Sequence, residues 1–409
     1  LKLTSGPSSA EPPVGQMPSL LVQKVAVAVF AASQALPALA SRSSSGILES
    51  YQDFRKRFGR AEQADHDAVS FETRLQHFQE SVAEVRRHNT GRGNTWVAVV
   101  NRFADYTPSE RRALLGYRRS ASLASAEPPV GSFLETRQRE VTVVDSIDWR
   151  SHVSAARHPV RDQGACGSCW AVAAVGALEM HAELNGHPTE PLSYEQLVDC
   201  VANPRSCGGT GGCGGATSEL AFDYVSKRGL LGAARYSGGY QAGGENRYSC
   251  PDVGKMGSPA VRAGGFQRLP SNKLAPLLRH VASTGPAVVS VDAAPWATYG
   301  HGVFAECSRN ATVNHAVLLV GFGHDTGLNM DYWLIRNSWS DAWGEEGHIR
   351  LQRHQADAGK EGFCGTDHDN QQGVGCKDDP KEVPVCGMCG ILSDSSYPTD
   401  VAVPHKQQI

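Results

Sequence analysis

The eleven cysteines in this chain of 409 residues constrain its fold more strongly than any other feature. A count this high is typical of proteins that fold in an oxidising compartment, where disulfides staple the chain. An odd count predicts disulfides plus one remaining thiol, which is then a candidate reactive group. Cys166 and Cys169 lie only three residues apart in the stretch QGACGSCW, and their chemistry decides the class of protein.

The overall composition excludes one large class of function. A formal net charge of −3 leaves no basic excess to neutralise phosphates, so we expect no nucleic-acid partner. The length predicts two or three domains. The sequence contains neither the glycine-rich phosphate loop with its lysine nor the His-Glu-x-x-His metal pair.

An export signal is expected near the start of the chain. Lys24 precedes a short apolar run at 25–32, and Ala-Leu-Ala at 38–40 fits a signal cleavage site. The run is shorter than the roughly 20 residues that span a bilayer, which disfavours the alternative of a membrane anchor. We therefore expect a signal peptide with its flanking segment at 1–45 and no stable membrane association.

A small helical unit is expected at 46–117. Its apolar residues follow helical spacing along one stripe: Phe71, Leu75, Phe78, Val82 and Val85. Residues 95–100 are typical of a strand. Thr107 and Glu110 form a capping box that begins a second helix, which Gly116 is expected to end. The segment at 118–144 has no periodicity and is interpreted as a linker.

The remainder, 145–409, is predicted to have a helical half followed by a sheet-rich half. Residues 169–184 are apolar on nearly all sides, which indicates a buried helix. Ser193 and Gln196 suggest a capping box, and a helix at 218–228 is expected to stop at Gly229. Strand patterns dominate after about residue 260. The fold class is therefore α+β, with a cleft between the halves as the natural place for a site.

Three interpretations of the Cys166–Cys169 pair are open on the residues alone. A redox pair follows a strand in a βαβ unit, whereas this pair precedes a buried helix. A zinc site formed with Cys386 and Cys389 has acceptable spacing, but thiolates in an oxidising compartment tend to become disulfides. A nucleophilic thiol needs no metal or organic cofactor, and we expect none.

The nucleophilic interpretation gives each residue type a task. Cys169 opens a helix, whose N-terminal dipole stabilises a thiolate. Gln163 supplies an amide donor for an oxyanion, His315 is a candidate base, and Asn337 is a candidate partner for the imidazole.

The three blocks CGSCW, NHAVLLVGFG and RNSWSDAWGEEGHIRL, in this order, resemble the papain and cathepsin L family of cysteine peptidases. The resemblance implies a two-lobed fold with a helical left lobe and a β-barrel-like right lobe. It also implies that Cys169 attacks the peptide carbonyl, His315 shuttles the proton and Asn337 holds His315. Trp339 would shield that hydrogen bond, and Gln163 with the Cys169 N–H would form the oxyanion hole. The expected activity is that of an endopeptidase acting on proteins and peptides; a papain-like binding protein without turnover is the alternative.

The N-terminal unit resembles the inhibitory propeptide of the same family. The family's interrupted helix pattern falls on Ser70, Arg74, Phe78, Ser81, Val85 and Asn89, of which Arg74, Phe78 and Asn89 match. A second pattern falls on Val99, Asn101, Phe103 and Asp105, with only its glycine lost. The chain's own propeptide is thus expected to act as an intramolecular inhibitor, released by cleavage in 118–144 under acid conditions.

The resemblance also suggests three disulfides, namely Cys166–Cys213, Cys200–Cys250 and Cys307–Cys389, with Cys207 as a possible substitute for Cys213. Two further bridges would join Cys207, Cys364, Cys376 and Cys386, in an order that the sequence does not give. Most of these cysteines lie in or beside an insertion at about 355–385. The insertion is either a stapled surface loop or a loop that flanks the cleft and alters access to it.

Substrate contacts are carried over from the family by position. Asp394 is expected at the floor of the pocket for the side chain two residues before the cleaved bond, which predicts a preference for hydrophobic and also basic residues. Ser218 and Ala287 are expected in its walls, and Gly214, Gly215 and Ala216 offer backbone pairing. Asn310 begins a glycosylation sequon. We expect a monomer in the secretory pathway, directed to a lysosome or vacuole or to the exterior.

Overall fold

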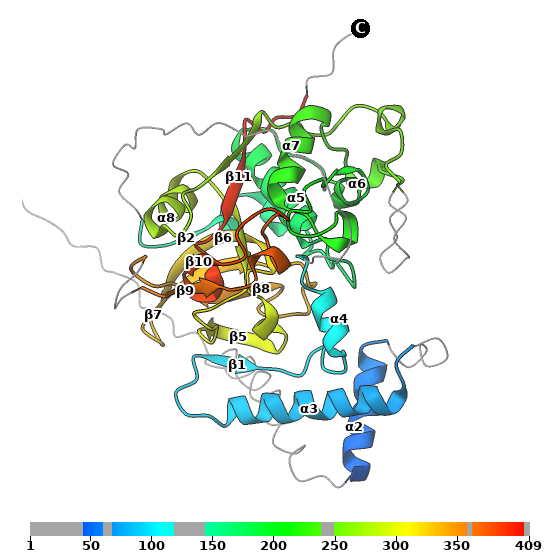
Figure 1. Cartoon of the computed structure of the whole chain (residues 1–409), viewed down its shortest axis with the longest axis vertical. Helices are drawn as coiled ribbons and strands as arrows, with labels where there is room; N and C mark the ends of the chain where they lie inside the picture. Colours follow the sequence, from blue (N-terminus) through cyan, green and yellow to red (C-terminus); the bar gives the residue numbers. More distant parts are fainter. Residues whose placement is uncertain (1–43, 60–67, 118–143, 239–248, 358–361, 405–409) are drawn as a thin grey trace, which may run out of the picture. The chain divides into compact units, whose positions relative to one another are not determined.

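The computed structural model describes residues 44–59, 68–117, 144–238, 249–357 and 362–404 (Figure 1). The chain divides into two compact units, Leu1–Leu75 and Gln76–Ile409, which are described separately. The expected signal cleavage site and nearly all of the expected linker lie outside the described residues. Among the described helices, none is long and apolar enough to cross a bilayer.

The first unit contains α2 (Ser44–Arg57) and the first residues of α3 (Phe71–Asn89). Tyr51 and Phe54 are buried, and the Tyr51 ring lies 5.4 Å from the ring of Phe71, measured between centroids. The helix α3 crosses into the second unit, as the apolar stripe predicts, and buries Phe78 and Val85 there.

The second unit begins with the rest of α3, followed by β1 (Trp96–Ala98) and α4 (Pro108–Ala113). The capping box of Thr107 and Glu110 is present in both directions, which confirms the predicted helix start. The expectation that Gly116 ends this helix is wrong, since α4 stops at Ala113 and the chain continues without helix through Tyr117.

Three helices form the helical half of the second unit. The helix α5 (Cys169–Leu184) is buried along almost its whole length, because it is apolar on every side. Around it lie α6 (Tyr194–Cys200) and α7 (Ser218–Arg228). Gly229 ends α7 with a φ of 75°, as predicted. Ser193 caps α6 as predicted, but the side chain of Gln196 binds Tyr224 and Gly229 instead of closing the box.

The sheet-rich half contains a nine-stranded sheet in the order β1-β5-β8-β7-β6-β4-β11-β3, with β2 paired to β6. The strands are β2 (Ile147–Asp148), β3 (Gly265–Arg268), β4 (Ala287–Val291), β5 (Tyr299–Phe304), β6 (His315–Asp325), β7 (Met330–Arg336), β8 (His348–Gln352) and β11 (Ser395–Thr399), and α8 (Leu274–Ser283) precedes β4. A small second sheet pairs β9 (Cys364–Asp367) with β10 (Val383–Cys386). Figure 1 shows α5, α6 and α7 grouped together, with β6 next to α5 and with β5, β7 and β8 farther from the helices.

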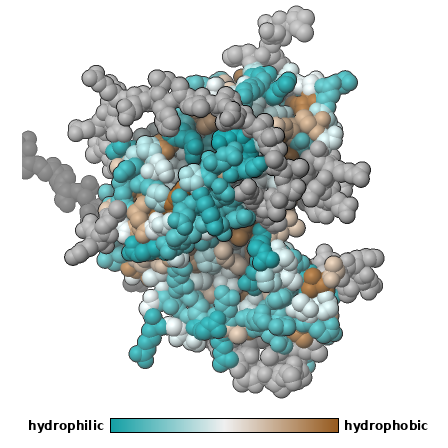
Figure 2. All heavy atoms as spheres, viewed as in Figure 1, coloured by the Kyte–Doolittle hydropathy of each residue, from teal (hydrophilic) through white to brown (hydrophobic). Residues whose placement is uncertain are grey.

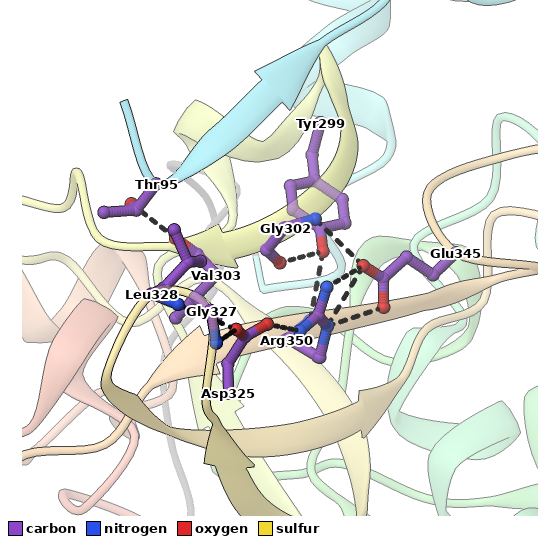
Figure 3. A network of polar contacts seen from close by, with 9 residues as sticks. All are labelled: Thr95, Tyr299, Gly302, Val303, Asp325, Gly327, Leu328, Glu345 and Arg350. Carbon is purple, nitrogen blue, oxygen red and sulfur yellow. Dashed lines mark hydrogen bonds and ion pairs between the residues drawn. The ribbon is translucent and has the colours of Figure 1, made fainter. Parts of the chain in front are cut away.

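The strand β1 extends the large sheet at its edge. It pairs antiparallel with β5, and the Thr95 hydroxyl adds a hydrogen bond of 2.6 Å to the Val303 carbonyl. Behind this edge the Glu345 carboxylate accepts hydrogen bonds from the Gly302 N–H and from Arg350 (Figure 3). Arg350 also binds Asp325, so the charged network holds the strand to which β1 pairs.

Five disulfides staple the second unit: Cys166–Cys213, Cys200–Cys250, Cys207–Cys376, Cys307–Cys389 and Cys364–Cys386. Three of them are the pairs that the family resemblance suggests. The other two tie the insertion to the rest of the fold: one closes the β9–β10 hairpin, and the other joins the insertion to the glycine-rich loop of the helical half.

Few large hydrophobic side chains are exposed on the described part of the protein. Hydrophilic residues predominate on the face shown in Figure 2. Within the described residues, the exposed large hydrophobic side chains are limited to Phe71, Val144 and Leu328. These three are isolated along the chain, which is ordinary for a soluble surface.

Candidate active site

Cys169 is the first residue of α5 and is fully buried. It takes part in none of the disulfides among the described residues. Its Sγ atom accepts a hydrogen bond of 3.3 Å from the backbone N–H of Ala316, which belongs to the sheet half. The thiol therefore lies where the two halves meet, at the positive end of a helix dipole that favours its ionised form.

His315 and Asn337 meet because β6 and β7 are adjacent antiparallel strands. His315 begins β6, Asn337 follows directly after β7, and His315 Nε2 lies 2.8 Å from Asn337 Oδ1. The same oxygen accepts the Ser338 N–H, which identifies it as the amide oxygen and makes Nε2 the donor. The neutral imidazole then has its lone pair on Nδ1, which has no hydrogen-bond partner among the described residues.

The aromatic ring of Trp339 covers this pair. Its centroid lies 5.2 Å from that of His315, and the Trp339 side chain is 1% exposed. Phe103 of the propeptide packs against the same indole at 5.5 Å. The hydrogen bond between His315 and Asn337 is therefore separated from bulk water on this side.

Burial lowers the pKa of His315 to about 4, although its hydrogen bond to Asn337 acts in the opposite direction. With the propeptide in place, the imidazole is thus neutral at all pH values well above 4. An ion pair with a Cys169 thiolate requires a higher pKa, which re-exposure of the imidazole after propeptide removal favours.

Gln163 is held beside the thiol by its own neighbours. Its Oε1 accepts the Ser338 hydroxyl, and its Nε2 donates to the Cys166 carbonyl at 2.8 Å. The same Nε2 also donates to the carbonyl of Leu114, in the segment that follows α4, at 3.0 Å. The Leu114 carbonyl oxygen therefore occupies the donor that we expect to serve an oxyanion.

The segment that follows α4 crosses the thiol at Gly116. A Cβ atom at this position would lie 2.1 Å from Cys169 Sγ, so no larger residue fits without displacement. On the opposite side, a Cβ atom at Gly215 would lie 2.0 Å from the carbonyl oxygen of Gly116. The chain passes through the cleft only because both residues are glycines. The glycine at position 116 is therefore explained by this close passage and not by a helix end.

Tyr117 fills a pocket next to the thiol. Its backbone N–H donates to the Asn314 carbonyl at 3.1 Å, and its buried hydroxyl lies 3.0 Å from the Ser290 hydroxyl. Ser290 in turn donates to Asp394 Oδ2 at 2.6 Å. The pocket therefore contains Asp394 at the depth reached by a tyrosine hydroxyl.

The carboxylate of Asp394 already has a cationic partner. Arg268 donates to Asp394 Oδ1 at 2.8 Å, and the Arg268 side chain is 62% exposed at the pocket rim. Glu219 lies in the same group, and burial together with Asp394 raises its pKa. Sequence reasoning missed Arg268, since nothing in a local pattern pairs β3 with the segment that precedes β11.

The predicted pocket walls are corrected in part. Ala287 packs in the hydrophobic cluster of the sheet half, whereas Val288 shares a cluster with Tyr117 and Ala216. Alternate residues of β4 face opposite sides, so Val288 and not Ala287 lies on the side of Tyr117. Ser218 is buried and donates its hydroxyl to the Trp170 carbonyl at 2.9 Å. Gly214 lies with Gly215 in the loop opposite the thiol.

Two alternative chemistries for the cysteines are contradicted. Cys166 is bonded to Cys213, so it forms no redox pair with Cys169. Cys386 and Cys389 are bonded to Cys364 and Cys307, which leaves no thiolates for a zinc site. The sequon residue Asn310 is exposed, and its Oδ1 accepts the Thr366 N–H at 3.0 Å.

A cleft of this kind, filled by the chain's own N-terminal segment, defines the class of proteases made as inactive precursors. Residues 143–373 match the model of the papain family of cysteine proteases, and residues 51–110 match the cathepsin propeptide inhibitor domain. The chain belongs to this family and is a cysteine endopeptidase precursor with an inhibitory propeptide.

Among its relatives, "Cysteine endopeptidase Rep1" of Oryza sativa subsp. japonica is 31% identical over 332 residues, or 78% of this chain and 76% of the relative. "Cathepsin L-like proteinase" of Phaedon cochleariae is 32% identical over 310 residues, which are 75% of this chain and 88% of the relative. The solved structure of digestive procathepsin L 3 from Tenebrio molitor larval midgut is 28% identical. The match covers 88% of this chain and 100% of the chain in that structure, with a TM-score of 0.63. The two-lobed, papain-like α+β fold expected from the sequence is confirmed.

Proposed function

We propose that Cys169, His315 and Asn337 hydrolyse peptide bonds through a thiol acyl-enzyme. One observation carries this proposal. The Cys169 thiol at the start of α5 meets β6, which begins with His315, and Asn337 fixes the tautomer of that histidine. The Cys169 thiolate attacks the carbonyl carbon, and the imidazolium of His315 donates its proton to the leaving amine. Water, deprotonated by the neutral imidazole, then attacks the thioester and releases the acid and the thiol.

The oxyanion of each tetrahedral intermediate requires preorganised donors. The Gln163 amide is fixed by Ser338 and the Cys166 carbonyl, so little reorganisation is needed when a substrate oxygen replaces that of Leu114. The backbone N–H of Cys169 is the second donor that we assign. Trp339 shields the pair of His315 and Asn337 during both steps.

Replacement of Gly116 by valine is expected to weaken autoinhibition. The added side chain overlaps Cys169 Sγ, so the chain must move out of the cleft, and we expect the precursor's activity before cleavage to rise about 100-fold, equivalent to nearly 3 kcal/mol. Peptide hydrolysis by the uncleaved precursor at neutral pH measures this. Arg112→Val, at an exposed position on α4, is the matched control. The prediction is contradicted if the uncleaved Gly116→Val precursor hydrolyses the peptide no faster than the uncleaved wild-type precursor.

For the pocket we propose a preference for hydrophobic side chains two residues before the cleaved bond, with tyrosine and phenylalanine foremost. Tyr117 occupies this pocket in the precursor, with its ring in the apolar cluster and its hydroxyl on Ser290. A basic side chain is accepted through Asp394 only when it displaces Arg268 from that carboxylate. The exposed position of Arg268 makes this displacement feasible.

The test uses three matched fluorogenic peptides with Tyr, Leu or Arg at that position, after acid activation with a thiol reductant. We expect Arg268→Ala to raise kcat/KM for the Arg peptide about tenfold relative to the Tyr peptide, since a charge-assisted bond to Asp394 becomes free. Asp394→Ala is expected to abolish the gain, and Arg262→Ala, also exposed, is the control. An unchanged ratio in Arg268→Ala contradicts the role given to Asp394. Cleavage of none of the three peptides favours the alternative of a binding protein without turnover.

The domain limits and the setting of the enzyme complete the proposal. We assign 1–45 to the signal, 46–117 to the propeptide, 118–144 to the activation linker and 145–409 to the peptidase. Five disulfides are consistent with folding in the secretory pathway and delivery to a lysosome, a vacuole or the exterior. A polar surface supports a monomer, and the exposed Asn310 supports glycosylation.

A further inference from the structure

The insertion crosses from one half of the peptidase to the other. It leaves the sheet half through the β9–β10 hairpin, which Cys364–Cys386 closes. Between these two strands the chain runs out as a loop that includes residues 373–376. We call these four residues the strap.

On the sheet side, the strap is bound to the loop that precedes His315. The Val374 N–H donates to the Val313 carbonyl at 2.9 Å. A Cβ atom at Gly373 would lie 2.1 Å from the same oxygen, so this approach requires a glycine. Nearby, the buried Asp367 carboxylate accepts the Val313 N–H at 3.1 Å and the Thr312 hydroxyl at 3.2 Å.

On the helical side, the strap is bound to the glycine-rich loop. The Gly375 carbonyl accepts the Gly208 N–H at 3.2 Å. The next residue, Cys376, forms a disulfide with Cys207. Lys377 extends the attachment with a hydrogen bond of 3.1 Å from its N–H to the Arg205 carbonyl. The strap is therefore hydrogen-bonded to both halves and covalently fixed to the helical one.

Both attachment points adjoin the pocket that Tyr117 fills. A Cβ atom at Gly208 would lie 2.8 Å from Tyr117 Cδ1. The Tyr117 N–H donates to the carbonyl of Asn314, the residue after Val313. The Val374 side chain packs against the hydrophobic cluster that contains Tyr117. Gly116 lies at the thiol, and Tyr117 is the next residue. The strap therefore lies at the Tyr117 end of the cleft, beside the residue that follows the one at the thiol.

We propose that the strap is a substrate-binding element that ends the cleft after the second residue on the N-terminal side of the cleaved bond. This inference rests on the proposed function and on the assignment of the Tyr117 pocket to that second residue. The Gly208 N–H, which flanks the pocket, already donates to the strap and is not available to a third residue. The Val313 carbonyl accepts the Val374 N–H and is covered by the close approach of Gly373. A longer chain must leave the cleft there, so further residues contribute no binding.

A peptide ladder tests this proposal. The enzyme is expressed as the full chain, activated by propeptide removal and assayed with peptides that keep Tyr two residues before the cleaved bond and carry zero, one, two or four further N-terminal residues. We expect kcat/KM to change less than twofold along the ladder. In Cys207→Ser/Cys376→Ser, which frees one end of the strap, we expect the peptide with four further residues to gain at least fivefold over the shortest. Cys364→Ser/Cys386→Ser is the matched control, because it removes a disulfide of the same insertion and leaves the strap attached; its profile should remain flat.

The possible outcomes distinguish a failure of the strap proposal from a failure of the proposed function. A rise of fivefold or more along the wild-type ladder overturns the strap proposal and leaves the proposed function intact, and this reading needs no variant. A ladder that stays flat in both double variants likewise overturns it, since the release of the strap then opens nothing. If no peptide is cleaved after propeptide removal, the proposed function fails and the strap proposal fails with it.

Discussion

Cys169→Ala is expected to remove peptide hydrolysis altogether, with kcat/KM lower by a factor on the order of 10⁴ or more. No other described thiol can replace it, because each of the other cysteines is in a disulfide. His315→Ala should cause a loss of similar size, since the residues of such a unit are strongly non-additive. Asn337→Ala should cost about 10- to 100-fold, equivalent to one buried hydrogen bond of roughly 1–3 kcal/mol.

The measurement is hydrolysis of the Tyr peptide by acid-processed enzyme in the presence of a thiol reductant. The Cys169→Ala precursor needs processing by added wild-type enzyme, and its unfolding midpoint serves as the folding control. Residual hydrolysis in a folded, processed Cys169→Ala enzyme within 100-fold of wild type contradicts the assignment of the nucleophile. A loss in Asn337→Ala as large as that in His315→Ala shows that Asn337 does more than orient the ring.

Glu179→Gln is expected to destabilise the peptidase strongly. Glu179 lies in α5 with its side chain fully buried, and Arg161 binds it at 2.6 Å. It also accepts the Leu192 N–H at 2.7 Å. Removal of the carboxylate leaves the Arg161 guanidinium buried without its anion, close to a second buried cation, Arg336. A broken buried pair of this kind costs about 3–5 kcal/mol.

The Glu179 carboxylate is also expected to change how the free energy of unfolding depends on pH. Burial favours the protonated form of Glu179, but Arg161, with the hydrogen bonds from His158 and the Leu192 N–H, outweighs it and lowers the pKa from 4.5 to about 2. A depressed pKa in the folded state contributes stability that is present above the unfolded pKa and is lost as the pH falls towards 2. The contribution is about 3 kcal/mol, and Glu179→Gln should lack this part of the acid sensitivity.

Chemical unfolding of the Cys169→Ala precursor, with and without Glu179→Gln, between pH 3 and 6 measures both effects. The background variant prevents self-digestion during the measurement. We expect the two unfolding curves to differ most at pH 6 and to approach each other at pH 3. A difference that stays constant over this range contradicts the role given to the ionised Glu179.

The residues that we propose as catalytic could be picked out of the sequence because their signals are local. The CGSCW motif begins an apolar helix, and His315 and Asn337 each stand at one end of a strand pattern. The capping box of Thr107 and Glu110 is equally local and is present as predicted. Local sequence determines such elements because side-chain spacing and end caps act within a few residues.

The pocket could be predicted only in part. Which face of β4 lies toward Tyr117 could not be predicted, because a strand buried on both sides has no polar alternation to fix its register. Gly116 resembles a helix end in sequence, whereas in the fold it is the residue small enough to pass Cys169. Neither fact follows from a pattern within one segment.

By itself, the sequence determined the class of the enzyme, the α+β fold, the buried helix that presents Cys169 and the need for disulfides. Only the tertiary structure decided that Cys376 pairs with Cys207, that Arg268 occupies Asp394 and that Tyr117 fills the pocket beside the strap. The physical reason is the distance along the chain: Cys207 and Cys376 are separated by 169 residues. Pairings of this kind depend on how the two halves pack, and no local propensity encodes that packing.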